Sequence, residues 1–522
     1  MLRITFKFTM RNILFFVSFL FINIAVAQEI TSKIASENFN QGDFNTALKN
    51  YLELVKQEPE NSKYNYRIGV CYLNTNIDKA KAVGYLEKTL QLPEPDANTY
   101  YLLGRAYHFA YRFTDAIKMY EQFKANNSGT TENVIDVEKQ IEYCYNAIEL
   151  MKFPLDVTYK NLGQNINSRY RDYYPFVSKD ESYLIFNSKR DDGSSKQIDG
   201  TFTSEVYFSK TKNGELGKVR KLDQNINTLT GNEEIVGMSP DGEFLIFYFE
   251  NEKNFGDLAI AAFENEEIKN LQILPKTINS KSHEIAATIS KNGDAIYFAS
   301  DREGGFGGVD LYVSLKLPNG EWAPAQNLGP SINTSFDEDF PNITADGRSL
   351  YFSSKGHTSM GGYDIFKAGW DQVKRIWSDV KNIGFPINTP EDNTNFRESE
   401  NGRTGYVSAL RAEGLGDYDI YSVTFNEVEP EYTVIKGFVS TQDTANIIKD
   451  VFISVLDLQT DELYGSYLTN PITGRYIIIL PQGRFNLLVE VPGFKLHSEN
   501  IEVLGKSDYR SLIKKDFILI QD

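Results

Sequence analysis

The chain has 522 residues, which is enough for several domains. Its net charge of −17 at pH 7 argues against nucleic acid or an anionic lipid surface as the main partner. The only two cysteines, Cys71 and Cys144, are too few for a disulfide scaffold, and we predict two small buried side chains rather than a disulfide.

The first residues have the pattern of an export signal. Basic residues precede an apolar run from Ile13 to Ile24, and Ala25-Val26-Ala27 offers a cleavage site before Gln28. The run is too short to span a bilayer, and no later segment is apolar enough to do so. We therefore predict a signal peptide over residues 1–27 and export. We expect no lipid anchor, because no cysteine follows the run.

Residues 31–151 show the periodicity of paired helices, with small residues between aromatic ones at Gly42, Gly69 and Gly104. This spacing resembles a tetratricopeptide array of three units with a polar terminal helix. Arrays of that kind bind peptide or protein in a concave groove. The resemblance suggests Tyr66, Tyr101 and Arg105 as groove residues, although core or convex-surface positions suit them equally well.

A short corner returns five times between residues 155 and 426, every 52 to 60 residues. The copies are Ile166-Asn167-Ser168, Ile226-Asn227-Thr228, Ile278-Asn279-Ser280, Ile332-Asn333-Thr334 and Ile387-Asn388-Thr389. Each corner precedes a strand, a tight turn such as Asp241-Gly242 or Asn292-Gly293, and an aromatic strand. A period near fifty with strand-like content predicts a β-propeller.

The fifth repeat lacks a fourth strand, whereas the first corner follows an unassigned segment, residues 156–163, which is similar to residues 377–384. We therefore predict that this N-terminal strand completes the last blade and closes the ring, with five blades favoured over six. The turns, the aromatic strands and the Gly-Gly-x-Asp-Leu-Tyr stretch ending at Tyr312 resemble the TolB-like, WD-repeat-like propellers of bacterial envelope proteins.

Residues 432–522 follow an acidic linker and alternate like short strands, which predicts a small β-sandwich. Thr473-Gly474-Arg475-Tyr476 and Val491-Pro492-Gly493-Phe494 resemble the carboxypeptidase regulatory-like domain, an accessory module whose name implies no peptidase activity.

Known catalytic and metal motifs are absent from the sequence. No Gly-x-Ser-x-Gly elbow occurs, and the nearest lookalike, at His357 to Gly362, aligns with a propeller loop. The four histidines are scattered, and Asp337-Glu338-Asp339 lacks the spacing of a calcium loop, so a solvated turn is favoured there. We expect no cofactor, no metal and no enzyme activity.

The predicted fold class is thus multidomain: an all-α tetratricopeptide array, an all-β propeller and a small sandwich. This order resembles an OmpA-family envelope protein of the Bacteroidetes type without the OmpA-like domain, which leaves a peptidoglycan link in doubt. The resemblance implies a periplasmic or outer-membrane-associated scaffold for other envelope proteins, with type IX secretion accessories among its relatives. The alternative is a propeller that binds a small ligand or glycan at its mouth, and an enzyme using the channel ranks below both.

Overall fold

The computed structural model describes residues 32–521, except 92–94, 127–136, 229–230, 251–254, 372–373, 400–402, 427–431, 442–447, 449, 482 and 504–511. The predicted signal peptide lies outside the described residues. The chain divides into two compact units, Met1–Asn133 with Lys196–Phe202, and Val134–Ser195 with Thr203–Asp522. No helix within the described part of the chain is long and apolar enough to cross a membrane.

The first unit holds short helices that pack on their neighbours in chain order. Residues 32–40 are helical, and the further helices are α2 (Phe44–Gln57), α3 (Ser62–Leu73), η1 (Lys79–Lys81), α4 (Ala82–Thr89), α5 (Ala97–Phe109) and α6 (Phe113–Asn126). Asp43 and Asn61 cap α2 and α3 by accepting hydrogen bonds from backbone N–H groups of the first turn. Gly69 and Gly104 let α3 and α5 approach Leu86 and Tyr120 closely.

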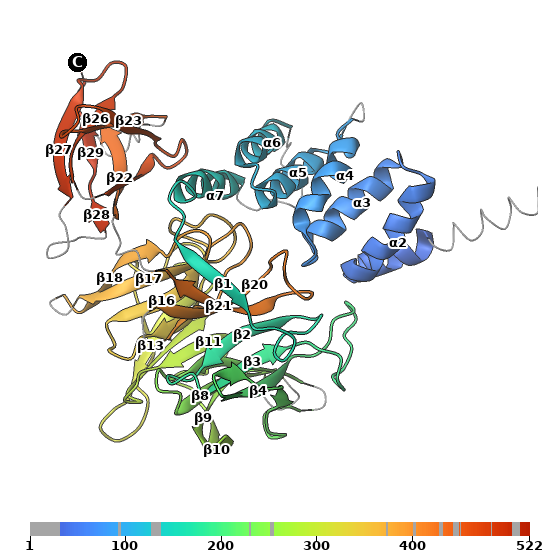
Figure 1. Ribbon diagram of the computed structural model, residues 1–522. Coiled ribbons are helices and arrows are strands. Elements are labelled where there is room, and N and C mark those ends of the chain that lie inside the picture. Colours follow the sequence, from blue (N-terminus) through green and yellow to red (C-terminus); the bar gives the residue numbers. More distant parts are fainter. Residues whose placement is uncertain are drawn as a thin grey trace, which may run out of the picture. The chain divides into compact units, whose positions relative to one another are not determined.

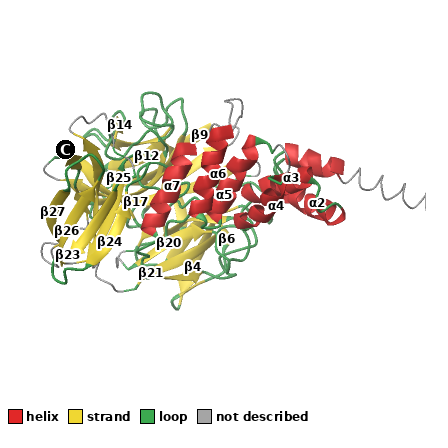
Figure 2. Cartoon of the chain, turned by 90° about the horizontal axis from the view of Figure 1, so that it is seen from above, coloured by secondary structure: helices red, strands yellow, loops and turns green. Residues whose placement is uncertain are grey.

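The predicted fold class is wrong for this part of the chain. Among the described residues there are 29 strands but only six named α-helices and one 3-10 helix, and strands make most of the regular structure in Figure 2. The three glycines Gly42, Gly69 and Gly104 were predicted to be small residues between paired helices of successive units, but Gly42 lies in a turn with φ of 82° while the other two are helical. The three glycines therefore do not mark one repeat.

The N-terminal unit is not all-α either. It includes residues 196–202, which form a β-bridge between Lys196 and Phe202. The helix expected to cap an array, α7 (Val137–Leu150), is assigned to the second unit instead. An independent all-α array over residues 31–151 is therefore not what the chain forms.

The second unit contains a β-propeller of five sheets within residues 157–425. The first sheet has β2 (Asp172–Val177), β3 (Tyr183–Ser188), β4 (Glu205–Lys212), β5 (Glu215–Leu216) and β6 (Arg220–Lys221). The second has β7 (Asn232–Met238), β8 (Phe244–Glu250), β9 (Phe255–Glu264) and β10 (Glu267–Ile273). The third has β11 (Glu284–Ile289), β12 (Ala295–Ser300), β13 (Asp310–Leu315) and β14 (Gln326–Asn327).

The fourth sheet has β15 (Glu338–Ile343), β16 (Ser349–Ser354), β17 (Asp364–Asp371) and β18 (Ile376–Asn382). The fifth has β19 (Arg397–Glu398), β20 (Thr404–Ala409), β21 (Asp419–Phe425) and, as its outermost strand, β1 (Val157–Asn161). Figure 1 shows β1 beside β21, and the two pair antiparallel from Val157 with Phe425 to Asn161 with Tyr421. The predicted strand exchange is confirmed: it joins the two ends of the propeller and leaves no open edge there.

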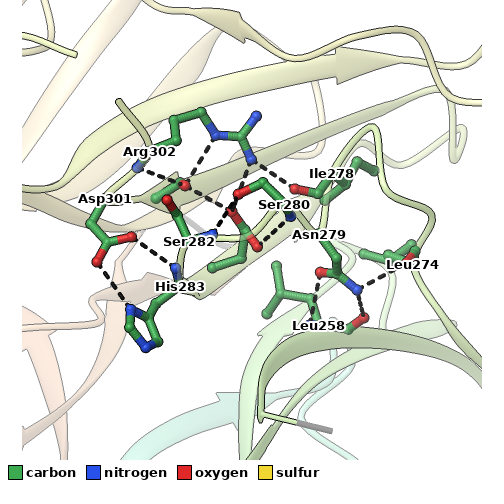
Figure 3. Close-up of polar contacts among 11 residues, drawn as sticks. Leu258, Leu274, Ile278, Asn279, Ser280, Ser282, His283, Asp301 and Arg302 are labelled. Atoms are coloured by element: carbon green, nitrogen blue, oxygen red, sulfur yellow. Dashed lines mark hydrogen bonds and ion pairs between the residues drawn. The ribbon is translucent and has the colours of Figure 1, made fainter. Parts of the chain in front are cut away.

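The repeated corner works as a backbone clamp. In every blade the corner asparagine accepts from the N–H and donates to the C=O of one residue in the preceding blade's third strand, at 2.7 to 3.0 Å. Figure 3 shows this for Asn279, which holds Leu258 and also donates to Leu274 O at 2.9 Å. The corner isoleucines are buried beside the clamps.

Residues 432–519 form two sheets around one apolar core. One sheet has β22 (Tyr432–Thr441), β25 (Arg475–Pro481), β28 (Leu512–Lys514) and β29 (Phe517–Leu519). The other has β23 (Phe452–Asp457), β24 (Leu463–Leu468), β26 (Gly483–Glu490) and β27 (His497–Val503). Their inward side chains, including Ile435, Ile453 and Leu487, are fully buried. The cysteine prediction is also confirmed, because Cys71 and Cys144 are buried free thiols.

The clamp can be tested by replacing Asn279 with alanine. The change leaves the buried N–H and C=O of Leu258 without their partner, which should cost about 3 kcal/mol of folding free energy. Denaturant unfolding of the full chain measures this. The matched control is N319A, because Asn319 is exposed and bonds only within its own turn. Equal effects of the two variants would contradict the clamp.

Candidate functional site

The five inner strands β2, β7, β11, β15 and β19 surround the propeller channel. Each begins after a corner, so the corners and the long loops after the second strands lie at one end, which we call the loop end. The tight turns between first and second strands lie at the other, the turn end. The two ends carry different side chains.

An aromatic plug separates the two ends. Tyr174 and Phe340 come from the first and fourth blades, which are not neighbours in the ring, yet their ring centroids lie 4.4 Å apart. Val236 and Ala286 pack into the same cluster. Both aromatic residues occupy breaks in strand register and have positive φ, 52° and 48°. Such bulges redirect a side chain, here toward the channel axis.

Most carboxylates at the loop end serve the fold. The corner serine or threonine donates its backbone N–H and its hydroxyl to an acidic or amide side chain at or shortly before the start of the inner strand, at 2.5 to 3.2 Å. These acceptors are Asp172, Glu233, Glu284, Glu338 and Asn393, and all are buried. Arg302 Nη2 adds a hydrogen bond to Glu284 Oε1 at 3.0 Å.

The residue after each of these acceptors differs from blade to blade. In chain order the residues at this position are Tyr173, Glu234, Ile285, Asp339 and Thr394. Glu234 is half-buried and accepts a hydrogen bond of 2.5 Å from the Tyr173 hydroxyl. These two side chains are therefore in direct contact across the first and second blades.

Asp339 is the most perturbed carboxyl of this set. It is 4% exposed, and burial raises its pKa to about 7 although Phe340 N donates to it at 2.7 Å. Asp337 raises the pKa further, and Lys355 lowers it. A carboxyl group that is partly protonated at neutral pH can donate as well as accept a hydrogen bond.

Arg171 and further tyrosines complete the cluster. The Arg171 guanidinium lies 4.7 Å from the Tyr173 ring centroid and 5.0 Å from that of Tyr418, and its Nε has no hydrogen-bond partner. Burial raises the pKa of Tyr363, and nearby Asp339 raises it further, which places these two side chains in one electrostatic environment.

We call this cluster the acidic mouth. It consists of Arg171, Tyr173, Tyr174, Glu234, Asp339, Tyr363 and Tyr418. Burial raises the pKa of Tyr174, and the carboxylates of Glu234 and Asp339 raise it further, so the strands bring both acids near the plug. Within the described residues no group of three or more metal-ligating side chains is arranged to hold a metal ion.

The residues proposed for a helical groove have different environments. Tyr101 is 1% exposed and packs against Tyr120 and Phe123, so it belongs to the core of the helices. Tyr66 is half-buried and accepts from Asn98 Nδ2 at 3.0 Å, and Arg105 lies over the Phe109 ring. A binding role for Tyr66 and Arg105 stays a prediction.

Two other sequence interpretations can be compared with the structure. The loop at His357 is structural, as predicted: His357 Nε2 bonds Ile332 O at 2.8 Å, and Ser359 Oγ donates to two backbone carbonyls. The solvated turn at residues 337–339 is wrong. Glu338 and Asp339 are buried, because β15 begins there and carries both into the propeller interior.

Sequence reasoning missed the acidic mouth. Part of its signal was available, since aligning the five repeats on the corner shows that the residue after the buried acceptor varies among tyrosine, carboxylate, isoleucine and threonine. The convergence of these positions required the ring geometry.

No family model matches this protein, and no curated protein matches it. Among solved structures it is similar to an α-L-arabinofuranosidase from Lactobacillus brevis, with 12% identity over 49% of this protein and 90% of that one and a TM-score of 0.32. It is also similar to RS223-β-xylosidase (12% identity, 52% and 96% covered, TM-score 0.33). A third similar structure is that of the RRP9 WD40 repeats (10% identity, 51% and 97% covered, TM-score 0.27).

These comparisons correct the expectation that the protein is not an enzyme. That expectation rested on the absence of a serine-hydrolase elbow and of a metal motif, which excludes only those kinds of catalytic site. An α-L-arabinofuranosidase and a β-xylosidase are among the similar solved structures reported above, and the absence of those motifs is by itself no ground for excluding catalysis.

The raised pKa of Asp339 predicts a pH dependence of stability. The folded state holds this proton up to about pH 7, whereas the unfolded chain releases it near 3.8. Protonated Asp339 therefore contributes on the order of 4 kcal/mol to the free energy of unfolding. This contribution is fully present below pH 3.8 and is lost as the pH rises through 7. We expect D339N to flatten the unfolding free energy between about pH 4 and 8 relative to the parent protein.

The control variant for this prediction is D180N. A hydrogen bond from Ser182 lowers the pKa of Asp180. The stability that ionised Asp180 contributes is therefore lost as the pH falls, which is the opposite pH dependence to that of Asp339. A D339N profile parallel to that of the parent protein would contradict the assignment.

Proposed function

We propose that the protein binds a glycan at the acidic mouth. The observation behind this proposal is the meeting of tyrosine rings with Glu234, Asp339 and Arg171 at the loop end of the inner strands. Carboxylates accept hydrogen bonds from sugar hydroxyls, and a guanidinium donates to their oxygens. Tyrosine rings offer an apolar face to the C–H groups of a sugar and a hydroxyl at the rim.

The charge of the mouth favours a neutral or cationic sugar over an acidic one. Two cations, Arg171 and Lys355, act on Glu234 and Asp339, but Lys355 is paired with Asp337 at 2.8 Å. The exposed carboxylate of Asp392 also raises the pKa of Tyr174. A uronate or sulfated sugar would meet like charge here, which costs binding free energy. Tyr363 and Tyr174 are half-buried, so part of each ring is open to a ligand.

Titration calorimetry with neutral di- to tetrasaccharides of glucose, xylose and arabinose tests the proposal. We expect saturable binding of at least one of them, and a weakening of about tenfold or more in E234Q and in Y363A, because each loses a direct contact. The control E267Q alters an exposed residue at the start of the outer strand β10 and should bind like the parent protein. Absence of binding throughout the panel, or an equal loss in E267Q, argues against the mouth.

The same samples can be assayed for newly released reducing ends, which measures hydrolysis. Activity that is lost in E234Q or D339N while the oligosaccharide still binds would extend the proposal from binding to catalysis. Binding without release would leave a binding protein.

We also propose that the protein is exported and meets other envelope proteins, as the predicted signal peptide and the resemblance to OmpA-family architectures imply. Cell fractionation should recover it in the periplasm or with the outer membrane, with a mature N-terminus at Gln28. Recovery of the full-length protein in the cytosol contradicts this location.

A further inference from the structure

The turn end of the channel holds a buried cation. Arg397, on the inner strand β19, is 6% exposed. Its guanidinium donates to three backbone carbonyls of the first and second blades: Val177 O at 3.2 Å, Met238 O at 3.1 Å and Ser239 O at 2.7 Å. Arg397 thus reaches from the last blade across the closure of the ring.

None of these contacts is an ion pair. Carbonyl groups supply dipoles, and none of the ion pairs within 4.0 Å among the described residues includes Arg397. Burial lowers the pKa of Arg397 to about 10, with Tyr183 and Asp241 acting against it, so the group stays charged at neutral pH. A buried charge is costly unless a partner of opposite charge compensates it.

A cavity of about 340 Å³ adjoins this guanidinium. We call it the turn-end cavity; its wall includes Arg397, Lys179, Lys367, Tyr351, Glu398 and Asp346. The volume is at the small end of the range for sites that bind small molecules. On β2 and β15 the cavity is lined by Val177, Asn342 and Ile343, which follow the plug residues Tyr174 and Phe340 along the same strands.

The two acids of the wall already have partners. Glu398 accepts from the Tyr351 hydroxyl at 2.9 Å and lies 3.9 Å from Lys367 Nζ. Asp346 accepts from Thr344 Oγ1 at 2.6 Å, and that hydrogen bond lowers its pKa. The basic side chains of Arg397, Lys179 and Lys367 outnumber the two acids of the wall, so these side chains carry a net positive charge in a protein whose net charge is −17.

We propose that the turn-end cavity binds a small oxyanionic group, a phosphate or a carboxylate, between Arg397 and Lys367. A guanidinium has five N–H groups, of which three are used on carbonyls, so two remain for an oxyanion. Its planar fork matches the spacing of oxyanion oxygens, and Lys367 adds a second charge at the wall. The bound anion would supply the counter-charge that the blades do not.

The test is titration calorimetry of the full-length protein with sodium phosphate and, separately, sodium acetate, at constant ionic strength set by sodium chloride. We expect saturable binding of at least one anion and a higher melting temperature as that anion is added. Stronger binding of phosphate or of acetate identifies which group the cavity prefers. No saturation with either anion overturns the proposal.

Two variants locate the binding. K367Q should weaken it about tenfold, whereas the control K160Q, an exposed lysine of β1, should leave it unchanged. R397K keeps the charge but loses the fork, and it should weaken binding more than K367Q does. Binding that is equal in K367Q and K160Q places the anion elsewhere and overturns the proposal. E234Q should leave anion binding intact, so failure at the mouth and failure here are distinguishable.

Discussion

The propeller depends on one buried amide in each blade. A third strand is covered on both sides by its neighbours, so any backbone N–H and C=O that its ladder leaves open must find partners inside the protein. The corner asparagine supplies both from the segment that enters the next blade, as Asn279 does for Leu258. Because the partner belongs to the following blade, the same bonds that satisfy the backbone also set the order of the blades around the ring.

Closure of the ring requires contacts that no single repeat contains. β1 pairs with β21 from the opposite end of the propeller sequence, and Arg397 reaches from the last blade to Val177, Met238 and Ser239. The plug of Tyr174 and Phe340 then divides the channel, so its two ends face different environments. One end gathers tyrosines and carboxylates, and the other holds a buried cation without an ion pair beside a cavity. A ligand at one end does not have to compete with a ligand at the other.

A feature of this protein could be predicted from the sequence only where a short, local sequence pattern encodes it. The corners, the turns and the exchanged strand are short sequence patterns, and they could be recognised because the chain repeats the blade pattern five times. The prediction for the helical part was wrong because glycine serves different structural roles. Gly42 lies in a turn, whereas Gly69 and Gly104 allow helices to pack closely. The acidic mouth could not be assembled from sequence, since Tyr173, Glu234 and Asp339 are far apart in the chain and meet only around a closed ring. No sequence pattern indicated the role of Arg397, because its partners are backbone carbonyls, which residues of any type supply.

Comparison of the repeats with one another separates residues that serve the fold from residues free to serve function. A position that is nearly the same in every blade, such as the buried acceptor at Asp172 or Glu284, meets a requirement that every blade shares. The next position has no such requirement, and it holds a different kind of side chain in each blade. Symmetry of the backbone therefore brings five unlike side chains to one place. A symmetric frame can recognise an asymmetric ligand through such positions, and in this propeller they bring the carboxyl groups of Glu234 and Asp339 near the aromatic plug.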